Sequence, residues 1–170
     1  MAVDTDPPAF PISVQLAAAI INGVHTDAAV LGFSNCVVAL VTQLASIGSL
    51  VHATVSRLSD GTVSAEHALQ ELSCAADVPV DVQFLLGNTS ASAASSLYQI
   101  LAINIAQSKH CQSPRDARPV ILGVALDLPR TYKLSLTAGG GDGDEDAPDM
   151  AAHAPVLDAL VSLVGECRVW

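Results

Sequence analysis

Residues 13–33 read SVQLAAAIINGVHTDAAVLGF, and this stretch decides the fold class. Asn22 and Gly23 separate two apolar runs, and both residues tolerate the positive φ angles of the tight turn that joins antiparallel strands. The stretch therefore predicts a β-hairpin with one strand over 13–21 and the next over about 26–33.

Further strands are expected on the C-terminal side of this hairpin. Turns at Ser34-Asn35 and at 45–48 extend it into a meander of four strands, and short turns favour antiparallel neighbours. We therefore expect one antiparallel sheet of about six strands. The strands beyond the hairpin are expected over residues 36–44, 49–58, 80–86 and 119–128.

Two main helices are expected to accompany the sheet. A helix capped by Thr89 or Ser90 should run to about Gln107, because a side-chain oxygen at the cap satisfies the first backbone N–H groups. The last helix should begin near Pro155, since proline suits a first helical turn. The apolar stripe of the first helix is Leu97, Leu101 and Ile105.

The element order predicts a single α+β domain over residues 1–170 with two insertions, at about 58–79 and 136–153. The second insertion contains the low-complexity acidic stretch 138–149, which cannot pack into a core. The role of this stretch is left open by the sequence. A domain of this length can bury a sizeable core.

Composition excludes several classes of function. The chain has 7 Lys and Arg against 17 Asp and Glu, a formal charge of −10, which does not suit a phosphate backbone. No apolar run approaches the ~20 residues of a membrane-spanning helix. The N-terminus is acidic and lacks the layout of a secretory signal, so we expect a cytoplasmic protein that can also be nuclear. The four cysteines are then expected to be free thiols.

No motif for catalysis, cofactor binding or metal binding is found. The cysteines and histidines lack zinc-ligand spacing, and no nucleophile elbow or phosphate-binding glycine loop is present. Asp142, Asp144 and Asp146 imitate part of a calcium loop, but Ala147 stands where its glycine belongs and His153 where its bidentate glutamate belongs. We expect no enzyme and no cofactor.

The apolar pattern indicates that one face of the sheet lacks a cover. Both faces of the strand over 119–128 are apolar, and two helices cover roughly one face of a six-stranded sheet. Gly123 and Ala125 suggest the helix side, because small residues let helices approach. The other side is then expected to form a dimer interface made by Val120, Leu122, Val124 and Leu126. The alternative is a monomer whose helices are divided between the two faces.

Several segments in this order resemble the proteasome assembly chaperone 3 family. The similar segments are residues 20–35, 36–43, 47–51, 83–87, 120–126 and the chain end Cys167-Arg-Val-Trp170. The resemblance covers about 115 of the 170 residues and fails in the two insertions.

The resemblance implies a non-catalytic chaperone without a cofactor. It would dimerise with itself or with a protein similar to proteasome assembly chaperone 4, and bind an α-type subunit of the 20S proteasome during α-ring assembly. Other proteasome chaperones dock through a tail with a penultimate tyrosine, and Val169 does not support that mode. We expect the turn Ser46, Ile47 and Gly48 to contact the α subunit. The alternative function is a roadblock- or longin-like dimeric scaffold.

Overall fold

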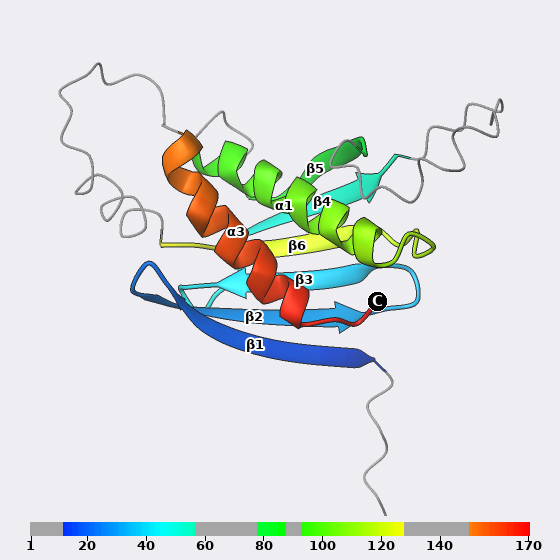
Figure 1. Ribbon diagram of the computed structural model, residues 1–170, viewed down its shortest axis with the longest axis horizontal. Helices are drawn as coiled ribbons and strands as arrows, with labels where there is room; N and C mark the ends of the chain where they lie inside the picture. The colour runs from blue at the N-terminus through cyan, green and yellow to red at the C-terminus, as the bar shows by residue number, and fades with distance from the viewer. Residues whose placement is uncertain (1–11, 57–77, 88–92, 128–149) are drawn as a thin grey trace, which may run out of the picture.

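The computed structural model describes residues 12–56, 78–87, 93–127 and 150–170, and in these ranges one sheet carries two helices (Figure 1). The acidic stretch 138–149 and most of both predicted insertions lie outside the described residues. The strands are β1 (Ser13–Ile21), β2 (Val24–Gly32), β3 (Val37–Thr42), β4 (Ser49–Val55), β5 (Val80–Leu86) and β6 (Val120–Ala125). The helices are α1 (Ala93–Gln112) and α3 (Met150–Glu166).

The hairpin predicted from residues 13–33 is confirmed. β1 has the predicted bounds, and β2 begins at Val24, two residues earlier than expected. Asn22 and Gly23 form the turn with φ angles of +50° and +75°, the left-handed conformation that favours these two residue types. Ile21 then pairs with Val24, and the register continues without interruption to Ser13 and Gly32.

The sheet has the expected six strands and is mixed rather than antiparallel. Its order is β1-β2-β3-β6-β4-β5, and β6 pairs parallel with β3 and antiparallel with β4. The predicted direct pairing of the third and fourth strands is therefore wrong. The loop from Gln43 to Gly48 connects β3 to β4, which are not adjacent in the sheet. β6 lies between them and is apolar on both faces, as a central strand requires.

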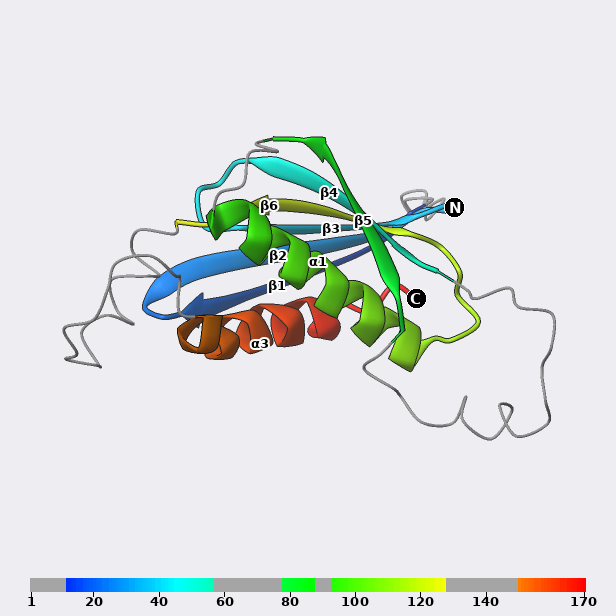
Figure 2. The same cartoon turned by 90° about the horizontal axis from the view of Figure 1, so that it is seen from above.

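Both helices lie on the same face of the sheet (Figure 2). α1 packs on β4, β5 and β6, whereas α3 packs on β1, β2 and β3. The alternative in which the helices cover opposite faces is therefore wrong. α1 ends at Gln112, beyond the predicted end, and Pro155 lies inside α3 because this helix begins at Met150. The predicted caps Thr89 and Ser90 lie outside the described residues.

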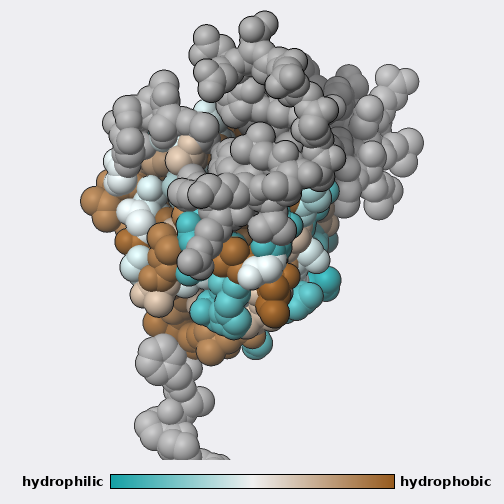
Figure 3. All heavy atoms as spheres, turned by 90° about the vertical axis from the view of Figure 1, so that its left-hand side faces the viewer, coloured by the Kyte–Doolittle hydropathy of each residue, from teal (hydrophilic) through white to brown (hydrophobic). Residues whose placement is uncertain are grey.

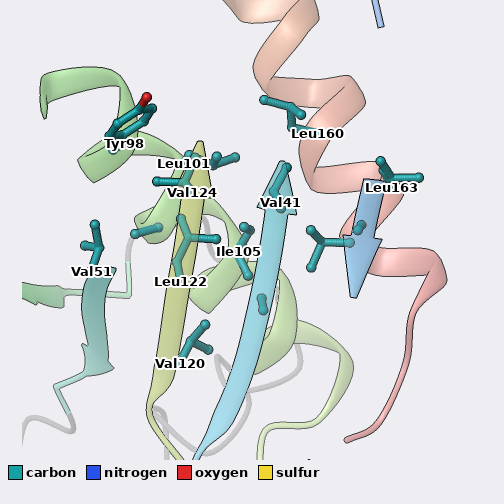
Figure 4. Close-up of a cluster of buried hydrophobic side chains, with 14 of the residues drawn as sticks. Val41, Val51, Tyr98, Leu101, Ile105, Val120, Leu122, Val124, Leu160 and Leu163 are labelled. Atoms are coloured by element: carbon teal, nitrogen blue, oxygen red, sulfur yellow. The ribbon is translucent and has the colours of Figure 1, made fainter. Parts of the chain in front are cut away.

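The hydrophobic core fills the space between the helices and the sheet (Figure 4). Leu101 of α1 and Leu160 of α3 meet Val41 and Val124 there, and each of these side chains is at most 1% exposed. Aliphatic residues make up almost the whole core, since aromatic residues are only 4% of the chain.

The residues expected on the dimer face lie in this core. The prediction is wrong because β6 is apolar on both faces, so alternation of residues along it does not reveal which face the helices cover. The small residue Gly123, taken as a mark of helix approach, lies on the opposite face under neighbouring leucines. The four core side chains, none more than 5% exposed, are Val120, Leu122, Val124 and Leu126.

Candidate protein-binding surface

The sheet face turned away from α1 and α3, here called the open face, carries mainly apolar side chains. Its residues follow from the strand registers and from the alternation with buried neighbours. The apolar members on the four adjoining strands β1, β2, β3 and β6 are Val14, Leu16, Ala18, Ile20, Ala29, Leu31, Val38, Leu40, Ile121, Gly123 and Ala125. Leu50 of β4 and Leu86 of β5 extend the face to its other edge.

Several large apolar side chains at the edges of the open face are more than half exposed to solvent. Leu16 is 75% exposed and Ile20 is 74% exposed, while Leu86 at the opposite edge is 59% exposed. Figure 3 shows apolar surface along the lower edge of the molecule, the height at which Figure 1 places β1. Contiguous apolar patches of this kind mark sites of interaction with other proteins.

Three apolar side chains converge over Gly123 near one end of the open face. A Cβ atom at this position would lie 2.6 Å from Cδ2 of Leu40, 3.3 Å from Cδ2 of Leu50 and 3.5 Å from Cγ2 of Ile47. The absence of a side chain on Gly123 is thus what lets the three residues meet. We call Leu40, Ile47 and Leu50 the apolar cluster.

The apolar cluster joins the open face to the turn that was predicted as a partner loop. Ser46, Ile47 and Gly48 are all exposed, and Ile47 reaches back over the sheet. Their contact with a partner stays a prediction. The close approach of this loop to β6 is enforced at Gly48, where a Cβ atom would lie 3.0 Å from the carbonyl oxygen of Val124.

Side-chain hydrogen bonds hold this loop in place. The hydroxyl of Thr42 accepts from the backbone N–H groups of Leu44 (3.1 Å) and Ser46 (3.3 Å) and donates to the carbonyl of Ser46 (3.0 Å). Gln43 donates to the hydroxyl of Thr26 (2.9 Å) and accepts from the backbone N–H of Asp127 (3.0 Å). Sequence reasoning missed Gln43, because its partners are distant in the chain.

Polar side chains on the open face lie beside the apolar ones. His25 and Asp27 of β2 form an exposed pair, with 3.6 Å between Nδ1 and Oδ2. Asp81 of β5 accepts a 2.6 Å hydrogen bond from the hydroxyl of Ser56. This mixture of apolar side chains and exposed polar side chains is typical of interfaces that form and separate.

A second group of polar residues lies at the junction of α1 and β6, beside a pocket of about 270 Å³. The Nζ of Lys109 donates to the carbonyl oxygens of Asp116 and Arg118, both at 2.8 Å, and lies 3.3 Å from the Asp116 carboxylate. Arg118 forms a bidentate pair with Asp116 and also donates to the carbonyl of Phe33 (2.7 Å).

The pKa values at this junction follow from these contacts. Hydrogen bonding to the Arg118 guanidinium holds the pKa of Asp116 well below its usual range. Burial lowers the pKa of Lys109, an effect that the nearby Asp116 carboxylate opposes. The hydrogen bonds of Lys109 and Arg118 are directed at groups within the chain, so this cluster fastens the end of α1 to β6 and the β2–β3 loop.

Other predicted site features are placed as follows. The described residues contain no group of three or more His, Cys, Asp or Glu side chains that could hold a metal ion. Cys36, Cys111 and Cys167 form no disulfide bond, while Cys74 lies outside the described residues. Neither described helix combines the length and the apolar character needed to cross a membrane.

The structure has two layers, with both helices on one face of the six-stranded sheet and an apolar open face that the described residues leave uncovered. No family model matches the sequence, and no curated protein matches it either. The structure is similar to one solved in a crystallographic study of a novel chaperone complex for yeast 20S proteasome assembly. The TM-score is 0.53 at 12% identity, with 90% of this chain and 96% of that chain covered. This likeness establishes the α+β fold.

Proposed function

We propose that the chain is a non-catalytic assembly chaperone of the 20S proteasome. The open face carries this proposal, because its apolar side chains need a protein partner and the described residues offer no cover for them. The shared fold with a component of a yeast 20S proteasome assembly chaperone complex supports the choice of this class over other dimeric scaffolds. A cytoplasmic location, extending to the nucleus, is part of the proposal.

Two binding events belong to this function. The open face is the proposed contact with a second chaperone, which is either another copy of the chain or a protein similar to proteasome assembly chaperone 4. The loop at Ser46, Ile47 and Gly48 is the proposed contact with an α-type subunit. Leucine and isoleucine side chains of the apolar cluster lie where these two proposed surfaces meet.

The test is capture of purified α-type subunits by the full chain, alone and together with a chaperone 4-like protein. We expect retention of one α-type subunit in preference to the others, without turnover of any substrate. Affinity purification from the native cell should recover the same subunit. Recovery of GTPase-regulating complexes instead of α-type subunits would favour the roadblock- or longin-like scaffold and overturn the proposal.

A loop variant tests the second surface. Ile47→Glu introduces a charge into the apolar cluster, whereas Leu44→Glu places the same charge on the same loop outside that cluster, at a residue of similar exposure (53% against 57% for Ile47). We expect Ile47→Glu to reduce α-subunit capture at least about tenfold, the effect of losing 1.4 kcal/mol of binding free energy. Leu44→Glu should have a smaller effect. Equal capture by both variants and wild type would remove the loop from the proposal.

A further inference from the structure

The outer edge of β1 is not paired with any other described strand. β1 is nine residues long, and only its inner edge is paired, with β2, among the described residues. Figure 1 shows β1 as the outermost described element on its side of the molecule. The strand runs in regular register and contains neither proline nor a charged residue. Such an edge presents a row of free backbone N–H and C=O groups to another strand.

The opposite edge strand, β5, has features that hinder pairing with another strand, and β1 lacks these features. β5 has seven residues, and its pairing with β4 is interrupted between Leu50 and Val51. It also carries a charge, Asp81, close to its beginning. Irregular register and charge are the features by which proteins prevent pairing at an edge. The two edges of this sheet are therefore not equivalent.

The side chains of β1 are complementary to a second copy of the same strand. Leu16 and Ile20 are the two most exposed large apolar residues in the part of the chain that the structure describes, and Ala18 lies midway between them on the same face. In an antiparallel pair centred on Ala18, each Leu16 lies directly opposite an Ile20 of the other copy. A two-fold symmetric interface requires this kind of self-complementarity.

We propose that β1 pairs antiparallel with β1 of a second copy, centred on Ala18, to give one continuous sheet across both copies. Charge does not oppose this contact, although the chain carries a net charge of −10. The nearest acid on the open face is Asp27, which pairs with Ala18 within the chain and lies beside His25. The two Asp27 residues would be three strand spacings apart, about 14 Å, beyond the screening length at physiological salt.

This contact is separate from the proposed chaperone interface. Edge pairing uses backbone groups in the plane of the sheet, whereas a partner on the open face covers side chains perpendicular to that plane. The open faces of the two copies would lie side by side and stay available. Edge pairing can therefore occur whether or not the chain binds a proteasome subunit.

Variants of the full chain in which the four native cysteines are replaced by serine and one new cysteine is added test the pairing. Ala18→Cys places the two new thiols directly opposite each other, within reach of a disulfide bond under mild oxidation. Ala29→Cys is the matched control on the open face of β2, where edge pairing leaves the two thiols more than about 14 Å apart. We expect a covalent dimer with Ala18→Cys alone, and peptide mass spectrometry should locate the bond at residue 18. Crosslinking of Ala29→Cys but not Ala18→Cys, or of neither, overturns the proposal.

Hydrogen exchange of the wild-type chain gives a second readout that does not depend on a substitution. Backbone amides of β1 that point outward exchange rapidly in dilute protein and should slow at least about tenfold at high concentration, because pairing satisfies them. If the protein associates and the amides of other segments exchange more slowly while those of β1 do not change, the contact lies on another surface and the edge pairing is overturned. Failure to capture α-type subunits would overturn only the proposed function.

Discussion

Lys109 is 3% exposed, and its ammonium group holds two carbonyl groups of the loop that leads into β6. Lys109→Met keeps the length of the side chain but leaves those carbonyls without their donor and removes one of the two cations beside the Asp116 carboxylate. We expect a loss of about 3 kcal/mol in the free energy of unfolding, measured by urea denaturation. Arg115→Met is the control, because Arg115 is exposed, and it should change stability by less than about 0.5 kcal/mol. Equal effects of the two changes would contradict the role of Lys109.

Asp116 makes the stability of the protein sensitive to acid. Its pKa in the folded state is below the ordinary value of 3.8, chiefly because of the Arg118 hydrogen bonds, so its contribution is fully present above that value. As the pH falls below about 4, the unfolded chain takes up the proton first and this contribution is lost. The difference in unfolding free energy between wild type and Asp116→Asn should therefore shrink between about pH 5 and pH 2. A difference that stays constant over this range would contradict the prediction.

At the scale of elements, local signals in the sequence predict where strands begin and end. The Asn22-Gly23 turn positions the first hairpin because few other residue pairs adopt its backbone conformation. β1 and β5 have the predicted bounds, and the other strands differ by a few residues at their ends. These features depend on neighbours in the chain, which is why a single sequence reveals them.

The order of strands and the covered face depend on distant contacts, and the sequence does not reveal them. β6 is inserted between β3 and β4, so that residues more than 80 positions apart pair, as Val37 does with Val120. The two faces of β6 are almost equally apolar, so the hydrophobic pattern does not show which face the helices cover. The prediction therefore placed the core side chains of this strand on the uncovered face. Within the described ranges one apolar face of the sheet has no cover, which a count of the elements in the sequence predicts. Which residues lie on that face could be assigned only from the structure.

The C-terminal residues connect the helix layer to the sheet. The Trp170 side chain lies in a groove between α1 and α3, beside Ile105 and Val161, and its indole N–H donates to Gln112 at 3.3 Å. Val169 packs on β2, where its Cβ would lie 3.3 Å from a Cβ atom at Gly32. The last residues of the chain therefore contribute to the fold instead of extending freely toward a partner.

Replacement of this tryptophan tests the connection. Trp170→Ala removes a half-buried aromatic ring and should lower the free energy of unfolding by about 2 kcal/mol, measured by urea denaturation followed by circular dichroism. Gln112→Ala removes only the hydrogen-bond acceptor and should cost about 1 kcal/mol or less. Since Trp170 is the sole tryptophan, its fluorescence in the wild type reports directly on this groove. A Trp170→Ala protein as stable as wild type would show that the tail does not support the helices.

For the whole molecule, the placement of both helices on one face divides the sheet into a covered face and an open face. Side chains on the covered face form the hydrophobic core, whereas those on the open face lack a covering layer among the described residues. Adjacent residues on one strand therefore have opposite roles. In β3, Val41 is 1% exposed in the core, and its neighbour Leu40 lies on the open face in the apolar cluster.

This division predicts opposite outcomes for one substitution at two adjacent positions. Leu40→Lys can extend its stem over the sheet and keep the ammonium group in water, so stability should fall by no more than about 1 kcal/mol. Val41→Lys buries an unpaired charge and should destabilise the fold by about 4 kcal/mol or more. Circular dichroism during urea denaturation measures both effects.

Leu40→Lys and Val41→Lys should also differ in how they affect binding. Solution mass and capture of the chaperone partner should show that Leu40→Lys is folded but no longer associates through the open face, because the charge would be buried there without a partner. Val41→Lys should lose association only to the extent that it unfolds. If Leu40→Lys associates as tightly as wild type, another surface carries the interaction, and the apolar open face has a different occupant or none.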